Sequence, residues 1–320
     1  MAAGKEGQQG KKNDGFHEGS TEWELKREEN GDYYRHAVIE LGELFLAIRT
    51  ILMHLTGEAG AKSRLDVGIA LARRFSSHLD IVFNVRPAVV PAASAGRGAY
   101  AHYMDEAIRH AHDMAGEIAH DIQTRCADLS WSWDVVDAEH LAPLRARAST
   151  SDLVILPAAP MTYIEDHFRW HLADCLPIDA ACPTLVLPKG YEGGGELGRH
   201  VLIAWCDCRE AARAVKDAMP FLKRAGKVSL LAVDCGGAPE ELDVQRIHDF
   251  LTRHGIAVEV SRAQSGARHA GKTILEFSAS EGCDLIVMGA YGTSRARQVV
   301  FGGATRHILR HLVVPVLMSH

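Results

Sequence analysis

The feature that most constrains the fold of this 320-residue chain is an internal repeat. The stretch DLVILPA, which begins at Asp152, returns as DLIVMGA at Asp284. In the same way, CPTLVLP around Pro183 returns as VPVLMSH around Pro315, and both pairs are 132 residues apart. A constant offset at two separate points indicates tandem duplication of one structural unit. The two halves of the chain are therefore expected to share a fold.

Within each half, short apolar runs alternate with helical patterns. Runs such as LDIVFNV and VSLLAVD are nearly all apolar, which is typical of strands buried on both faces. Between such runs, SRLDVGIALARRFSSH and REAARAVKDAMPFLKRAG place apolar residues at helical spacing. This alternation predicts an α/β fold of two tandem Rossmann-like domains, each a five-stranded parallel sheet flanked by helices.

Composition suggests where the domains begin and end. Residues 1–45 are mostly polar and are expected to form an N-terminal extension. The first domain is predicted over residues 46–190 and the second over residues 198–320. The glycine-rich stretch KGYEGGGELGR, residues 189–199, is predicted to be the linker between them.

Charge and hydropathy exclude several classes of protein. A net charge of −6 argues against a general nucleic-acid binder, and the apolar runs are too short or too interrupted to span a bilayer. The N-terminus lacks the pattern of a signal peptide. The seven cysteines are odd in number and scattered, which favours reduced thiols over a disulfide framework. We therefore expect a cytoplasmic protein with no membrane or nucleic-acid partner.

The stretch after the strand DLIVMGA is rich in glycine. It contains Gly289, Gly292, Gly302 and Gly303 and leads into the helical pattern ATRHILRH. Glycines let a backbone approach phosphates closely and adopt positive φ, and helix N-termini offer free N–H groups to anions. The alternative is that these glycines only permit a tight turn between strand and helix. The stretch follows the carboxyl end of a parallel strand, where ligands of such sheets bind, which favours phosphate binding.

These features together resemble the universal stress protein family in its tandem two-domain form. The family motif G-x2-G-x9-G-[ST] is matched by Gly289, Gly292 and Gly302, while Gly303 stands at the hydroxyl position and Thr305 matches a second hydroxyl. The resemblance covers residues 46–320 and implies strand order 3-2-1-4-5, with the last strands of the two domains pairing. A homo-oligomer is compatible with it.

The resemblance also implies a ligand, ATP, held in the second domain. The residues predicted to hold it are Ala204, Val233, Met288, Gly289, Gly292, Gly302, Gly303 and Thr305. In nucleotide-binding members an acidic residue ends the first strand, whereas Cys206 stands there in this chain and is followed by Asp207. Two interpretations follow: a stress-response protein that binds ATP, or a scaffold that binds no nucleotide and acts through protein contacts.

The first domain has lost the motif. The 132-residue offset places Pro157 and Pro160 opposite Gly289 and Gly292, and proline has no N–H to donate to a phosphate. By the same offset Trp170, His171 and Ala173 stand opposite Gly302, Gly303 and Thr305, and Thr56 takes the acidic position at the end of the first strand. ATP is therefore expected only in the second domain.

The sequence suggests no catalytic residue and no metal site. Cys206 and Cys208 form a single C-x-C pair without a second pair at zinc-finger spacing. The histidine-rich helix carries His110, Asp113, Glu117 and His120, whose best interpretation is a solvated polar face. There is no G-x-S-x-G elbow and no Walker motif. We therefore do not expect an enzyme.

Overall fold

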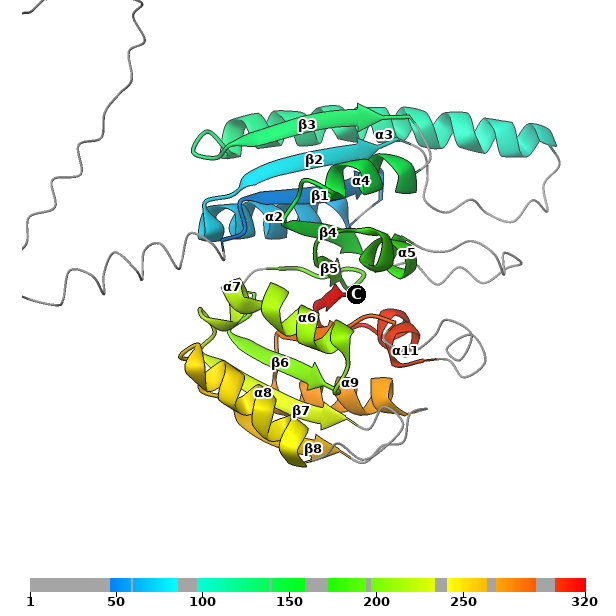
Figure 1. Cartoon of the computed structure of the whole chain (residues 1–320). Helices are drawn as coiled ribbons and strands as arrows, with labels where there is room; N and C mark the ends of the chain where they lie inside the picture. Colours follow the sequence, from blue (N-terminus) through cyan, green and yellow to red (C-terminus); the bar gives the residue numbers. More distant parts are fainter. Residues whose placement is uncertain are drawn as a thin grey trace, which may run out of the picture. The chain divides into compact units, whose positions relative to one another are not determined.

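The computed structural model describes residues 47–58, 60–85, 97–137, 140–158, 172–193, 197–233, 241–263, 269–291 and 303–320. The expected extension over residues 1–45 lies outside these residues. Strands and helices alternate along the described chain, as the apolar pattern predicts (Figure 1).

The first half contains five strands and four helices among the described residues. They are β1 (Thr50–Thr56), α2 (Ala61–Phe75), β2 (His78–Asn84), α3 (Arg97–Arg125), β3 (Trp131–Val136), α4 (Leu141–Ala148), β4 (Leu153–Pro157), α5 (Leu172–Asp179) and β5 (Thr184–Leu187).

The second half has the same order of strands. Its elements are β6 (His200–Trp205), α6 (Arg209–Asp217), α7 (Met219–Leu222), β7 (Lys227–Val233), α8 (Glu241–Arg253), β8 (Glu259–Ala263), α9 (Ala270–Glu281), β9 (Leu285–Gly289), α11 (Ala304–Arg310) and β10 (Val316–Ser319).

All ten strands belong to one sheet with the order β3-β2-β1-β4-β5-β10-β9-β6-β7-β8. Each half is parallel and has the strand order 3-2-1-4-5. The halves meet at the antiparallel pair β5–β10, in which Leu185 lies opposite Leu317 (Figure 1). The predicted fold class and the predicted pairing of the last strands are therefore confirmed.

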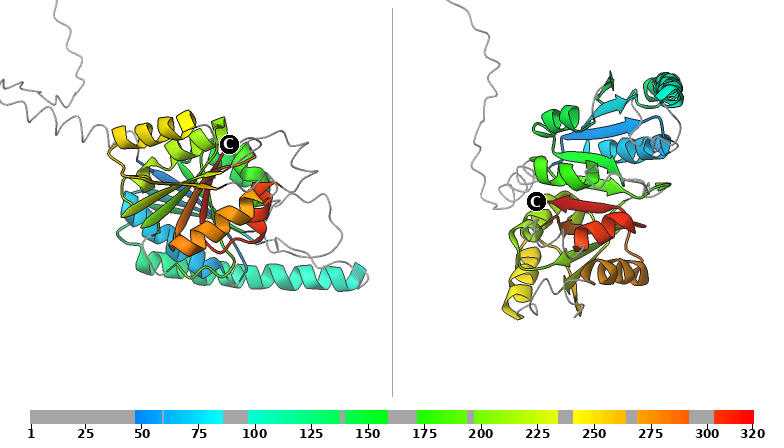
Figure 2. Two further views of the ribbon diagram at one scale, coloured as in Figure 1. Left: turned by 90° about the horizontal axis from the view of Figure 1, so that it is seen from below. Right: turned by 90° about the vertical axis from the view of Figure 1, so that its right-hand side faces the viewer.

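Helices cover both faces of the sheet (Figure 2). Alternate residues of each strand point to opposite faces, so Ile51 and Met53 of β1 join one core cluster while Leu52 joins another. The first cluster extends through both repeats beneath α2, α3, α6, α7 and α8. The opposite face is covered by α4 and α5 in the first repeat and by α9 and α11 in the second.

The repeat predicted from the sequence is visible in the element boundaries. Shifting β4, α5 and β5 by the 132-residue offset places them on β9, α11 and β10.

Asp152 and Asp284 have the same role in the two halves. The Asp152 carboxylate accepts hydrogen bonds from the N–H groups of Arg49 and Thr50, at 2.8 and 2.9 Å. Asp284 accepts three, from Gly198, Arg199 and His200, at 3.1, 2.9 and 3.0 Å. Each aspartate thus ties the start of the fourth strand of its repeat to the start of the first.

One expectation about helices was wrong, and one helix was not predicted. The stretch REAARAVKDAMPFLKRAG forms two helices rather than one, with a break at Ala218. Pro220 lies just after the break and has no N–H with which to continue the helical hydrogen bonds. Helix α5 was not predicted, because it is short and carries Pro177 in its last turn.

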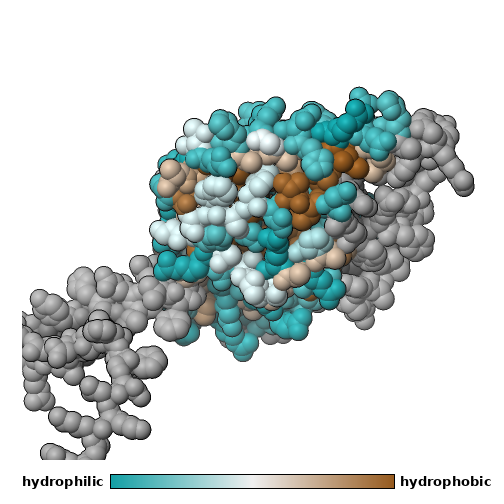
Figure 3. Space-filling view, turned by 90° about the horizontal axis from the view of Figure 1, so that it is seen from above, coloured by the Kyte–Doolittle hydropathy of each residue, from teal (hydrophilic) through white to brown (hydrophobic). Residues whose placement is uncertain are grey.

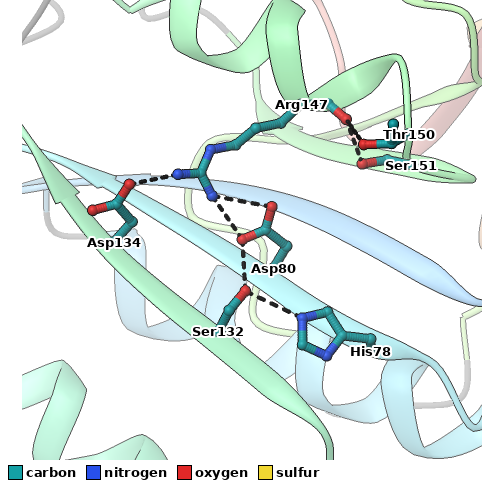
Figure 4. A network of polar contacts seen from close by, with 7 residues as sticks. All are labelled: His78, Asp80, Ser132, Asp134, Arg147, Thr150 and Ser151. Carbon is teal, nitrogen blue, oxygen red and sulfur yellow. Dashed lines mark hydrogen bonds and ion pairs between the residues drawn. The ribbon is translucent and has the colours of Figure 1, made fainter.

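In the first repeat, α4 is held to the sheet by an ion-pair network (Figure 4). Arg147 of α4 donates to both carboxylate oxygens of Asp80 on β2, at 2.9 and 3.2 Å, and also to Asp134 on β3. Ser132 donates to Asp80 at 2.7 Å and lies 3.1 Å from the His78 ring. The network fixes the outer strands of this half against α4.

The face above β3 and α3 is mostly hydrophilic, with apolar groups between the polar ones (Figure 3). Tyr103 of α3 and Val135 of β3 are exposed. Asp134 places a charge on this edge strand, which discourages pairing with another sheet.

Candidate functional site

The residues predicted to hold a nucleotide meet at the carboxyl edge of the second parallel half-sheet. Ala204, Val233 and Met288 lie at or next to the ends of β6, β7 and β9, and all three are buried in one apolar cluster on the α9–α11 face. Ala204 and Met288 are direct neighbours in the β6–β9 pairing. The structure therefore brings together three residues that the sequence separates by up to 84 positions.

Gly289 ends β9 where α6 begins to pack against the strand. A Cβ atom at this position would lie 2.5 Å from the Ala211 nitrogen and 2.6 Å from the Glu210 carbonyl carbon. Both are backbone atoms, which cannot move aside as a side chain can. Gly289 therefore has a packing role: it lets the first turn of α6 approach the end of β9.

The turn after β9 adopts positive φ at Tyr291, whose φ is 55°. Gly289 and Gly303 do not have positive φ, and Gly303 has φ −52° and ψ 162°. The expectation that these glycines supply positive φ is therefore wrong for the two that the structure describes. Gly292 and Gly302 lie outside the described residues.

Thr305, at the start of α11, contacts the turn after β9. Its side chain is buried, and its hydroxyl oxygen accepts a hydrogen bond from the Tyr291 N–H at 3.3 Å. Gly303 is the N-cap residue of α11 and makes no side-chain capping bond. The predicted hydroxyl at Thr305 thus contacts the turn that carries the motif.

Helix α11 follows the motif directly. It is seven residues long, so its macrodipole is weaker than that of a long helix. It packs closely on α9 because Gly271 has no side chain: a Cβ there would lie 2.8 Å from the Ala304 carbonyl oxygen.

A hydrogen bond between the two repeats anchors the same turn. The Tyr291 hydroxyl donates to the Asp174 carboxylate on α5 at 2.6 Å. Burial, and next the charge of Asp174, raise the pKa of Tyr291 above its ordinary value. Sequence reasoning missed this pair, because the two residues are 117 positions apart.

Cys206, which stands at the family's acidic position, follows β6 and is half-buried. It packs against the cluster on the α6 face, not the cluster that contains Ala204 and Met288. Asp207 is exposed at the tip of the same turn. Neither side chain belongs to the apolar cluster of the predicted site.

The corresponding edge of the first repeat is packed differently. Thr56 is buried at the end of β1, and Pro157 ends β4. Ala173, the counterpart of Thr305, is buried in the apolar cluster of the second repeat together with Ala158. Pro160, Trp170 and His171 lie outside the described residues. Where described, this edge makes contacts between the repeats.

The other candidate groups lie on surfaces. His110, Asp113, Glu117 and His120 are exposed on α3, and Glu117 accepts a hydrogen bond from Lys62 at 3.0 Å. Within the described ranges, no group of three or more His, Cys, Asp or Glu side chains is placed to hold a metal ion. The helices that the structure describes include none long and apolar enough to cross a membrane.

Comparison with known proteins identifies the second half. The model of the universal stress protein family matches residues 199–320. A universal stress protein from Synechocystis sp. is 41% identical over 49 residues, which is 15% of this chain and 17% of that relative. The match therefore spans a small part of the relative's length.

Solved structures resemble nearly the whole chain. A universal stress protein from Archaeoglobus fulgidus covers 86% of this chain and 97% of its own, with a TM-score of 0.62 and 16% identity. A functionally unknown protein from Pseudomonas aeruginosa covers 87% of this chain and 94% of its own, with a TM-score of 0.54 and 15% identity. At this identity the likeness concerns the fold. The second repeat, residues 199–320, is therefore a domain of the universal stress protein family, joined to a first repeat of the same fold.

Proposed function

We propose that this protein is a stress-response protein that binds ATP at the carboxyl edge of its second repeat. The observation that supports this best is the glycine spacing of the family motif, Gly289-x2-Gly292-x9-Gly302, in a domain that the family model matches. The spacing follows β9, the strand next to Ala204 of β6. Apolar residues and nearby backbone N–H groups are what an adenine ring and a phosphate chain require.

The proposal assigns different tasks to the two ends of the site. Ala204, Val233 and Met288 supply an apolar surface at the strand ends, and the turn from Gly289 to Gly303 supplies backbone N–H groups. Thr305 and the Tyr291–Asp174 pair hold the start of that turn in place. We propose binding without catalysis, because the sequence has neither a G-x-S-x-G elbow nor a Walker motif.

A titration of wild-type protein and Gly292→Val with ATP tests the proposal. A valine blocks close approach of the backbone to phosphate and resists positive φ. We expect saturable binding at one site per chain in wild type and its loss in Gly292→Val. Gly116→Val, at a position on α3 with no neighbour within 4 Å, is the matched control and should keep the affinity.

The second candidate function is a scaffold that binds no nucleotide. Cys206 at the acidic position and the packing role of Gly289 favour it. Wild-type protein that shows no saturable binding at millimolar ATP would establish this function, as would mass spectrometry that finds no nucleotide in the purified protein. Two equivalent sites per chain would contradict both the proposed stoichiometry and the loss of the site in the first repeat.

A further inference from the structure

The turn between β6 and α6 brings two cysteine side chains together. The Cys208 N–H donates to the Cys206 carbonyl oxygen at 2.8 Å, which closes a three-residue turn with Asp207 at its tip. The two sulfur atoms lie 3.0 Å apart. Both residues are half-buried.

Cys208 is also the N-cap residue of α6, in an extended conformation with φ −144° and ψ 157°. Its carbonyl oxygen accepts the first helical hydrogen bond, from Ala212 at 3.1 Å. Cys208 therefore stands at the start of α6, where the free N–H groups of the first turn stabilise a negative charge, although the thiol itself makes no capping hydrogen bond.

The ionisation of Cys208 reflects this position. The hydrogen bond with Cys206 lowers the pKa of Cys208 to about 7, and the backbone N–H groups of Ala211 and Glu210 contribute in the same direction. Burial and the Glu210 carboxylate oppose them. The lowered pKa raises the share of Cys208 that is thiolate at neutral pH, and the thiolate is the form that reacts with oxidants.

The buried cysteines of the chain behave in the opposite way. Burial raises the pKa of Cys182 to about 12 and that of Cys283 to about 11, and it also raises the pKa of Cys126. At neutral pH these thiols are therefore almost entirely protonated. These thiols therefore serve as internal controls for reactivity.

We propose that Cys206 and Cys208 form a redox-active dithiol, in which Cys208 is the attacking thiol and Cys206 the resolving thiol, with a hydroperoxide as oxidant. The proposal rests on the turn, the sulfur separation and the position at the helix start, and it is independent of nucleotide binding. A disulfide bond of about 2 Å requires the sulfur atoms to approach by about 1 Å from this separation.

Hydrogen peroxide oxidises the dithiol in two steps. The Cys208 thiolate attacks one peroxide oxygen and the O–O bond breaks, so that Cys208 becomes a sulfenic acid. The hydroxide that leaves takes up the proton lost by Cys208 and becomes water. Cys206 then gives up its proton and attacks the sulfenic sulfur, the S–S bond forms, and a second water leaves. Two electrons pass from the dithiol to one peroxide.

Mass spectrometry after trypsin digestion tests the proposal on the full chain. Cleavage after Arg199 and Arg209 places both cysteines in one peptide, HVLIAWCDCR, which contains none of the other cysteines. After brief treatment with hydrogen peroxide we expect this peptide to be lighter by two hydrogen atoms and to resist alkylation. Reduction should restore both free thiols, and the peptides that carry Cys182 and Cys283 should remain reduced at the same dose.

Two single variants distinguish the roles of the thiols. Cys206→Ser should stop at the sulfenic acid of Cys208, which a cyclic dione traps as a stable adduct. Cys208→Ser keeps a good N-cap residue and should prevent oxidation of Cys206 at the same dose. The proposal is overturned if the wild-type peptide stays a dithiol while Cys182 or Cys283 is oxidised. It is also overturned if the dione labels Cys206 in the Cys208→Ser variant as strongly as it labels Cys208 in the Cys206→Ser variant.

Discussion

At the scale of single residues, Gly289 shows that one position of the glycine motif has a packing role. We expect Gly289→Ala to lower the free energy of unfolding by about 1–3 kcal/mol, the cost of overpacking, because its Cβ would meet the backbone of Glu210 and Ala211. Gly116→Ala on exposed helix α3 should instead raise it by about 0.5–1 kcal/mol. Urea unfolding of both variants measures the difference. Equal changes would contradict the packing role of Gly289.

The Tyr291–Asp174 hydrogen bond leads to a prediction about pH. Because burial and Asp174 raise the pKa of Tyr291, folding favours its protonated form. That contribution to stability is complete below about pH 10, the pKa of an unperturbed tyrosine, and is lost as the pH rises above it. Between about pH 9.5 and 11 wild type should therefore lose stability more steeply than Tyr291→Phe, which has no phenol to ionise. Urea unfolding at several pH values in this range measures the stability of both proteins. Parallel stability profiles of wild type and Tyr291→Phe would contradict the prediction.

At the residue scale, the apolar runs predict where strands end. The structure brings Ala204, Val233 and Met288, which the family resemblance implies, to one edge at the ends of β6, β7 and β9. Tyr291 could not be recognised, because its positive φ and its partner Asp174 depend on packing between the repeats. The spacing of Cys206 and Cys208 is visible in the sequence, but the turn that brings their sulfur atoms close together is not.

At the scale of elements, the two aspartates that tie strand starts together provide a matched pair. Asp284 is half-buried and accepts three backbone hydrogen bonds, whereas Asp152 is exposed and accepts two. We expect Asp284→Ala to lower the free energy of unfolding by about 1.5–3 kcal/mol, the range for hydrogen bonds to a charged group. Asp152→Ala should cost less, since water replaces its partners more easily. Denaturant unfolding of the two variants measures which substitution lowers the free energy of unfolding more. A larger decrease in Asp152→Ala would refute the prediction.

Element prediction failed where proline or shortness hid a helix. The break at Ala218 follows from Pro220, which the helical spacing of apolar residues around it concealed. Helix α5 lacks a long apolar pattern, yet the 132-residue offset maps it onto α11. The internal repeat therefore contained information that local patterns did not.

At the scale of the whole molecule, an aromatic contact joins the repeats on the face opposite α5 and α11. Phe75 of α2 and Phe221 of α7 meet edge to face with ring centroids 5.1 Å apart, and Arg224 lies over the Phe75 ring. Phe221 is fully buried, so Phe221→Ala should lower the free energy of unfolding by about 3–5 kcal/mol. Val313→Ala, at a side chain that is 65% exposed, should have little effect.

The cooperativity of unfolding shows whether the contact between Phe75 and Phe221 couples the two repeats. The shared core and the continuous sheet predict that wild type unfolds in one transition, observed alike by far-UV and near-UV circular dichroism. In Phe221→Ala the two probes are expected to separate as the repeats begin to unfold independently. If the two probes remain coincident and the midpoint is unchanged, Phe221 does not couple the repeats.

The pairing of β5 with β10 has a further consequence, which concerns protein concentration. A dimer of single-domain chains dissociates on dilution, but here each half meets its partner at an effective concentration fixed by the short connection between Leu187 and His200. The fraction of chains in which the two halves are paired is therefore the same at low and at high protein concentration. The composition of the pair is fixed as well, since one half that has kept the motif is always matched with one that has not.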